Sequence, residues 1–386
     1  MVCFKFPLRV LYGEFLVIPS RLSRRHVLRG AAIATILPVA SRIPPARAAE
    51  LTVGFIYVGP EDDYGYNQSH AMAAAEVKKM PGVIVVEQEN VPETQAVTEA
   101  MASMIQLDGA RLLFPTSFGY YRPFVVDAAR ANPRVQFRHC GGLWTDKDPK
   151  NAGSFFGYID EAVYLSGIIA GYQTKSKKLG FVAAKPIPQV LLNINAFTLG
   201  ARRVDPSITT QVIFTGGWSL PVREAEAVNA LADQGIDVLT CHVDSPKVTV
   251  LTAASRKIYV CGYHTSQAAL VPDFYLTGAE WNWIKIYRPF VEEMQAGRPL
   301  PNFVRGGLPE GYVKTSPYGA MVGEPARQQA DEVKALMMKK QFNVIKGPLK
   351  DNQGHLVVPA GTSYGEYAPQ LETMNYLVEG VKGTIS

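Results

Sequence analysis

Short apolar segments rich in β-branched residues alternate with segments of helical periodicity from residue 51 to about residue 300. The apolar segments predict strands at Thr52–Val58, Val83–Glu87, Arg111–Pro115, Gln136–Cys140, Ser154–Tyr158, Leu179–Ala183, Thr210–Phe214, Val238–His242 and Lys257–Cys261. The segments between them predict helices at Ala71–Lys79, Gln95–Leu107, Tyr120–Ala131, Ala162–Thr174, Val190–Arg203, Arg223–Gln234 and Val248–Ser255. Strands that are apolar almost throughout are buried on both faces, and short connections to helices produce parallel βαβ units. The chain is therefore predicted to be a doubly wound α/β protein.

The predicted strands fall into two consecutive sets, one ending near Tyr158 and the other beginning at Leu179. Two such sheets in tandem imply two lobes with a cleft between them. Ligands of open parallel sheets bind beyond the carboxyl ends of the strands, so the strand-end loops of both lobes are expected to face this cleft. The alternation stops near residue 300, where Gly- and Pro-rich segments predict a hairpin around Asn352-Gln353-Gly354 and a surface helix over Pro325–Lys340.

The formal charge of +5 suggests a nucleic-acid-binding protein, but the location of the charge argues against it. Residues 1–48 contain eight basic residues and one acidic residue, and the rest of the chain contains 31 basic and 33 acidic residues. The basic excess therefore belongs to the N-terminal segment and not to a binding surface.

That segment has the layout of an export signal. Arg24 and Arg25 precede the apolar run Gly30–Ala40, and Ala46-Arg47-Ala48 places small residues where a signal peptidase needs them. The paired arginines predict a twin-arginine signal peptide over residues 1–48 and a periplasmic protein. The alternatives are an ordinary secretory leader and a membrane anchor, although the apolar run is far shorter than the ~20 residues of a membrane span.

Three cysteines follow the leader: Cys140, Cys241 and Cys261. An odd number in an oxidising compartment favours buried thiols, while a Cys241–Cys261 bridge stays open as an alternative. No cysteine and histidine spacing predicts a metal site.

Aromatic, hydroxyl and amide side chains gather in the segments that follow the predicted strands and where the chain returns near residue 281. An aromatic ring among hydrogen-bonding groups suits a flat heteroaromatic ligand. The residues predicted to bind it are Tyr66, Asn67, Ser117, Phe118, Asn195, Trp218, His242, Asp244 and Trp281.

An enzyme is the alternative from another class. Ser117, His242 and Asp244 are the residue types of a nucleophile, a base and an orienting acid, but no G-x-S-x-G or H-E-x-x-H motif accompanies them. No G-x-G-x-x-G follows the first strand, so no dinucleotide cofactor is predicted. The sequence favours a binding protein without catalytic residues, cofactor or metal.

These segments also carry a family resemblance, which covers about residues 51–362. The chain resembles the basic membrane protein family of ABC-transporter substrate-binding proteins, related to bacterial purine nucleoside receptors. The resemblance is carried by Val53–Pro60, Tyr64–His70, Thr116–Tyr120, Gly167–Gly171, Asn195–Ala201, Asp233–Asp237, His242–Ser245 and Trp281–Trp283. It implies a type I periplasmic binding-protein fold, with two lobes joined by three crossovers and a ligand cleft between them. Residues 49–158 and about 278–310 would form the N-terminal lobe, and 159–277 and about 311–386 the C-terminal lobe.

The resemblance implies a soluble monomer that delivers a purine base or nucleoside to an ABC permease. The chain departs from the family around Glu280–Asn282, where nucleoside-binding members commonly carry a ribose-binding lysine. That departure favours a smaller planar base or another ligand. One alternative is a non-purine solute whose cationic or amide group is selected by Glu280 and His264. The others are a ligand sensor without transport and a nucleoside hydrolase.

Overall fold

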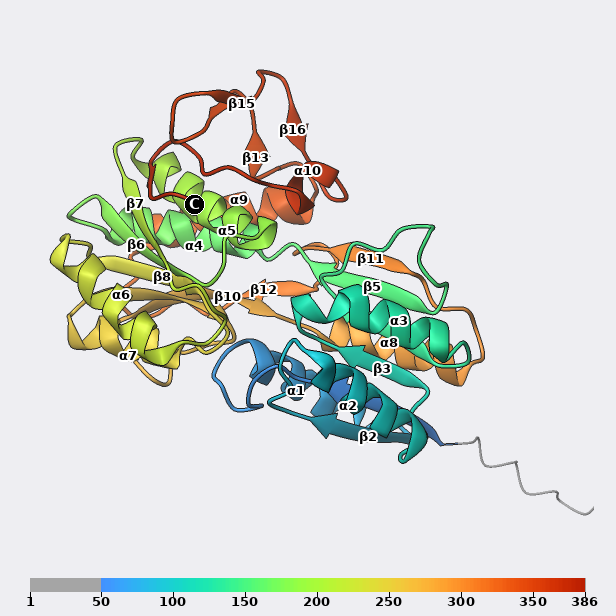
Figure 1. Cartoon of the computed structure of the whole chain (residues 1–386). Coiled ribbons are helices and arrows are strands. Elements are labelled where there is room, and N and C mark those ends of the chain that lie inside the picture. The colour runs from blue at the N-terminus through green and yellow to red at the C-terminus, as the bar shows by residue number, and fades with distance from the viewer. Residues whose placement is uncertain (1–49, 386) are drawn as a thin grey trace, which may run out of the picture. The chain divides into compact units, whose positions relative to one another are not determined.

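The computed structural model describes residues 50–385, so the predicted signal peptide lies outside the described residues. Strands β1 to β5 are Leu51–Ile56, Val83–Gln88, Leu112–Pro115, Gln136–Cys140 and Ala152–Gly157. With β11 (Phe303–Gly306) they form a parallel sheet of order β11-β5-β4-β3-β1-β2. Its helices are α1 (Tyr66–Val77), α2 (Gln95–Gln106), α3 (Val126–Ala131) and α8 (Ile284–Gln295). We call this part the N-terminal lobe (Figure 1).

The second sheet has the order β12-β10-β9-β8-β6-β7-β17 and is parallel except for the antiparallel β10–β12 pair. Its strands β6 to β10 are Lys178–Ala183, Thr209–Phe214, Val238–His242, Tyr259–His264 and Tyr275–Trp281, with β12 at Val313–Thr315 and β17 at Val381–Lys382. Its helices are α4 (Asp160–Gln173), α5 (Pro188–Val204), α6 (Pro221–Asp233), α7 (Lys247–Ser255) and α9 (Glu324–Met338). We call this part the C-terminal lobe.

The chain crosses between the sheets three times, after β5, after β10 and after β11. The fold is therefore the type I periplasmic binding-protein fold that the resemblance implied. The predicted lobe boundary between residues 277 and 278 cuts through β10, which lies entirely in the second sheet. Residues 278–281 were thus wrongly placed in the N-terminal lobe, because the chain leaves the second sheet only after Trp281.

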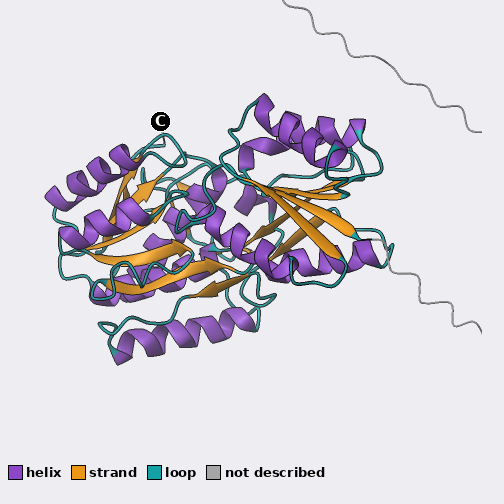
Figure 2. Cartoon of the chain, turned by 90° about the horizontal axis from the view of Figure 1, so that it is seen from below, coloured by secondary structure: helices purple, strands orange, loops and turns teal. Residues whose placement is uncertain are grey.

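Helices cover both faces of each sheet (Figure 2). In β1, Phe55 packs against Tyr287 of α8, with ring centroids 5.0 Å apart, while Ile56 joins the apolar cluster that contains Met101 of α2. Alternate residues of a strand point to opposite faces, so a strand covered on both sides must be apolar throughout. This is why the apolar segments predicted the strands to within a few residues.

Helices α4 and α5 pack against each other through small residues. A Cβ added to Gly167 would lie 2.2 Å from the carbonyl oxygen of Phe197, and one added to Gly200 would lie 2.1 Å from that of Tyr164. Only glycine permits this backbone approach. The contact places the first turn of α5 beside the cleft.

The helix predicted over Tyr120–Ala131 is interrupted. It consists of a 3₁₀ turn at Phe118–Tyr120, a π-type turn at Tyr121–Val125 and then α3. Pro123 disfavours the helical conformation in the residue before it, and Arg122 accordingly has φ −121° and ψ 129°.

The C-terminal segment contains the short strands β13 (Ile345–Lys346), β14 (Leu349–Lys350), β15 (Leu356–Val358) and β16 (Ser363–Tyr364) and the helix α10 (Pro369–Glu372). The antiparallel β14–β15 pair confirms the predicted hairpin. The three cysteines are buried free thiols, as the odd count predicted. No helix within residues 50–385 has the length and apolar character needed to cross a membrane.

Candidate functional site

A cavity with an empty volume of about 430 Å³ lies between the two lobes. We call it the interlobe cavity. Nine strands, β1 and β3 to β10, direct their carboxyl ends or the segments that follow them into it. Seven predicted residues line it: Tyr66, Ser117, Phe118, Trp218, His242, Asp244 and Trp281.

The lobes touch each other around this cavity, so the structure is closed. The backbone N–H of Tyr66 donates to the carbonyl oxygen of Asp244 (2.8 Å), and the Ser245 hydroxyl donates to that of Asp63 (3.1 Å). A Cβ added to Gly65 would lie 2.0 Å from the Asp244 carbonyl oxygen. Glycine at position 65 therefore permits the closest backbone approach at the closed interface.

Asp244 is the main polar feature of the cavity. Its side chain is buried (7% exposed), and within residues 50–385 no group donates a hydrogen bond to its carboxylate. Burial raises its pKa well above the usual value, and the negative charges of Asp63 and Glu93 raise it further. Burial without a donor therefore favours the protonated acid in the ligand-free cavity, and a ligand that donates a hydrogen bond favours the ionised carboxylate.

The two cavity histidines are neutral. Burial lowers the pKa of His242 to about 3, and its Nδ1 accepts a hydrogen bond from Nδ2 of Asn193 (2.9 Å). Burial also lowers the pKa of His264 well below its usual value, with further lowering by His242 and His70. Nδ1 of His264 accepts from Nε1 of Trp281 (2.8 Å). Both rings therefore offer hydrogen bonds and apolar surface, and neither supplies a positive charge.

Aromatic rings form the walls of the cavity. Tyr66 meets His264 edge-on, with centroids 5.3 Å apart, and its hydroxyl donates to the Thr116 carbonyl oxygen (2.6 Å). Trp281 lies against Phe156, with centroids 5.4 Å apart. Rings held in place on both lobes can enclose a flat ligand.

Two predicted site residues, Asn67 and Asn195, do not line the cavity. Nδ2 of Asn67 donates to Oδ2 of Asp63 (2.8 Å), and its Oδ1 accepts the Gly59 N–H (3.2 Å), so its amide organises the start of α1. Asn195 faces the C-terminal segment, where Nδ2 donates to the Tyr376 carbonyl oxygen (2.9 Å) and Oδ1 accepts the Val378 N–H (2.8 Å). Both amides are fully used within the protein.

Glu280 does not line the interlobe cavity either. Its Oε1 accepts a hydrogen bond from Ser316 (2.5 Å), and its Oε2 pairs with Lys314 (3.0 Å). Glu280 lines a separate hollow instead, together with His264 and residues of α1.

Six lining residues were absent from the predicted site: Cys140, Gly141, Phe156, Ile187, Gln189 and His264. His264 had a signal, because it ends the strand β9 and was noted as an alternative selector. Cys140 and Phe156 read as ordinary core residues of β4 and β5, so no pattern distinguishes them from the residues around them.

A hollow with a larger empty volume, about 770 Å³, lies between α4, the end of α9 and the C-terminal segment. Lys340 in this hollow binds Glu310 and Glu366, and Glu161 accepts the Leu308 N–H (2.7 Å). Of the strands in the two large sheets, the end of one, β5, lies beside this hollow, whereas nine direct their ends toward the interlobe cavity, so we place the candidate site in the interlobe cavity. Among residues 50–385, no cluster of His, Cys, Asp or Glu side chains is grouped as a metal site requires.

Two parallel sheets that close over a shared cavity define a solute-binding protein. The sequence profile of the ABC transporter substrate-binding, PnrA-like family, Bmp, matches residues 50–347. The chain belongs to this family, whose members bind a small-molecule ligand and a permease and are not enzymes.

Comparison with individual proteins agrees with this assignment. The chain is 33% identical to a purine-binding protein of Brucella abortus (strain 2308), over 86% of this chain and 93% of that protein. It is 27% identical to a Haloferax volcanii protein that is named for glucose binding in an ABC transporter, over 88% of this chain and 83% of that protein. Among solved structures, a solute-binding protein of an ABC transporter from Conexibacter woesei has a TM-score of 0.63 at 21% identity, covering 76% of this chain and 98% of that one. At this identity the structural likeness bears on the fold alone.

Proposed function

We propose that this protein binds a purine base or nucleoside in the interlobe cavity and delivers it to the permease of an ABC importer. The observation that carries the proposal is the unpaired, buried carboxylate of Asp244 among aromatic rings from both lobes. The purine-binding relative supports the ligand class.

Recognition would combine ring contacts with directional hydrogen bonds. Tyr66, Phe118 and Trp218 supply flat or apolar surface, which contributes about 25 cal/mol per Å² of apolar area buried. The carboxylate of Asp244 accepts from a ring N–H or an exocyclic amine. A ligand that lacks this donor leaves the carboxylate unpaired, at a cost of about 1–3 kcal/mol. Contacts made with both lobes at once would shift the protein toward the closed form.

A thermal-shift series tests the ligand class. The purified protein is unfolded, dialysed and refolded to remove bound solute, and then mixed with adenine, guanine, adenosine, guanosine or glucose. A purine should raise the melting temperature by several degrees, because a ligand that binds only the folded state stabilises it. If no purine raises the melting temperature, the proposal is refuted. A response to glucose alone would favour a sugar, the second candidate, which the Haloferax relative supports.

We propose further that residues 1–48 direct the folded protein to the periplasm by the twin-arginine route, where it acts as a monomer. Replacing both Arg24 and Arg25 by lysine should block export of a fused, prefolded reporter. Failure of the native leader to export this prefolded reporter would indicate an ordinary secretory leader. Light scattering during size-exclusion chromatography should give the mass of one chain.

A further inference from the structure

Glu93 lies between β2 and α2 in the N-terminal lobe, outside the lining of the interlobe cavity. Its Oε1 accepts hydrogen bonds from the Ser117 hydroxyl (2.7 Å) and from the Gly119 backbone N–H (2.8 Å). These contacts lie within one lobe. They hold the carboxylate at the rim of the cleft and hold the segment after β3 in place.

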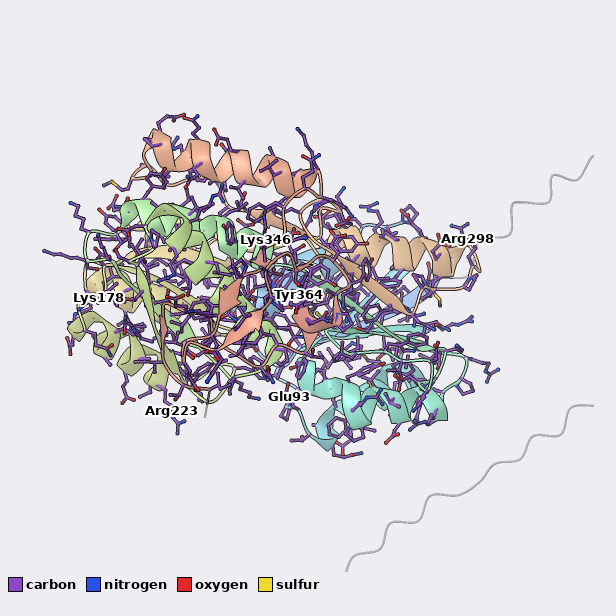
Figure 3. The ribbon with its side chains drawn as sticks, turned by 90° about the horizontal axis from the view of Figure 1, so that it is seen from above. Glu93, Lys178, Arg223, Arg298, Lys346 and Tyr364 are labelled. Carbon is purple, nitrogen blue, oxygen red and sulfur yellow. The ribbon has the colours of Figure 1, made fainter. Side chains whose placement is uncertain are left out.

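The same carboxylate reaches the other lobe. Nε1 of Trp218 donates to Oε1 (3.2 Å), and Nζ of Lys185 donates to Oε2 (3.3 Å). Nζ of Lys185 also lies 4.7 Å from the centre of the Trp218 ring. Glu93 thus connects Ser117 and Trp218, which line the cavity from opposite lobes. Figure 3 labels Glu93 where the ribbons of the two lobes meet.

The cross-cleft contact is partly shielded from water, since the side chains of Glu93 and Lys185 are 20% and 35% exposed. Burial raises the pKa of Glu93, but hydrogen bonds from Ser117 and Gly119 and the charge of Lys185 outweigh it and hold the pKa below its usual value. Glu93 is therefore ionised at neutral pH, and its hydrogen bonds are of the strong, charge-assisted kind.

We propose that Glu93 is a positioning residue that fixes Ser117 and Trp218 on the two walls of the cavity and, through Lys185, holds the lobes closed over the ligand. This inference rests on the proposed function, because it assigns the ligand to the interlobe cavity. A ligand enclosed between the lobes leaves only after the contacts of Glu93 break. Glu93 therefore controls the dissociation rate of the ligand and has little effect on the association rate.

The test uses Glu93→Gln and Lys185→Met with adenine as the probe. Stopped-flow measurement should show dissociation about tenfold faster in Glu93→Gln, because a charge-assisted contact is lost, with the association rate unchanged. The double variant should release adenine no faster than the faster of the two single variants, because both changes remove the same Glu93–Lys185 contact. High salt should speed dissociation from the wild type and leave Glu93→Gln unaffected. Glu89→Gln is the matched control, because Glu89 bonds only within its own lobe, to the Glu61 N–H.

A second measurement needs no bound purine. Spin labels at Leu107→Cys and Val222→Cys, which are 80% and 72% exposed and lie on different lobes, report the lobe separation in a Cys3→Ser background. The native Cys241 and Cys261 are buried and do not compete for label, and Cys140, which lines the cavity, is also replaced by serine. The closed population should be smaller in Glu93→Gln than in the wild type or Glu89→Gln.

These outcomes separate the two proposals. If the wild type binds no purine, the proposed function fails, and the spin-label distances still decide the role of Glu93. Equal dissociation rates in wild type and Glu93→Gln, or equal closed populations in both, overturn the assignment of Glu93.

Discussion

Replacing Asp244 by asparagine should have opposite effects on stability and on ligand binding. Burial raises the pKa of Asp244, so the folded state holds its proton more tightly than the unfolded chain does. The ionised group therefore costs stability above the unfolded-state pKa of about 3.9. The cost is absent below that pH, grows as the pH rises, and stops growing above the pKa of the folded state.

The magnitude follows from the missing donor. A buried charge without a donor costs more than the neutral amide that replaces it, so Asp244→Asn should stabilise the ligand-free protein by about 1 kcal/mol or more at pH 7. Each kcal/mol raises the melting temperature by roughly 2–4 °C in chains of 150–250 residues, and by somewhat less in this longer one. The gain should vanish near pH 4. Purine affinity should fall roughly 10–150-fold, because a hydrogen bond to a charged group contributes about 1.5–3 kcal/mol.

Calorimetric melting from pH 4 to pH 8 and isothermal titration with adenine measure the two effects. Asp233→Asn is the control, because Asp233 is an exposed residue of the same lobe, and it should not change affinity. A variant that is less stable than the wild type at pH 7 would mean that the carboxylate has a structural partner. An unchanged affinity would mean that Asp244 does not touch the ligand. Either result refutes the reasoning.

Three further predictions test the closed interface, a buried ion pair and the role of Asn195. Gly65→Ala should weaken ligand binding at least about tenfold and keep the lobes apart in X-ray scattering, because its Cβ would overlap the Asp244 carbonyl oxygen. An unchanged affinity would contradict the closed interface. Arg305→Met should destabilise the protein by about 3–5 kcal/mol in urea unfolding, because it leaves the buried Glu372 carboxylate without its cationic partner. The added change Glu372→Gln should recover much of this loss in stability. Asn195→Leu should lower stability by about 1–3 kcal/mol, because the Val378 N–H loses its acceptor, while adenine affinity measured by titration stays at the wild-type value.

The candidate site could be predicted where it follows from sheet topology. Trp218, Asp244 and Tyr66 lie far apart in the sequence, yet each follows the carboxyl end of a parallel strand. Two parallel sheets that face one cleft bring such segments together whatever their side chains are. The structure accordingly gathers these three residues around one cavity.

Asn67 and Asn195 could not be separated from the site residues by the same argument. Both lie in helices beside the cleft, and the direction of each amide depends on the partners that the fold supplies. The amide of Asn67 donates to Asp63. The amide oxygen of Asn195 accepts the N–H of Val378, which lies 183 residues further along the chain. Residue type and local position alone do not reveal such partners.

The two doubly wound sheets follow from the residue pattern alone, because strands buried on both faces must be apolar and helices must cover them. The same pattern also determined which chain segments meet at the cleft. The pairing of the polar groups there follows from the tertiary structure: among residues 50–385 no group donates to the Asp244 carboxylate, while the Glu93 carboxylate accepts four hydrogen bonds from residues of two lobes. The satisfaction of a polar group depends on distances between residues far apart in the chain, and folding sets those distances.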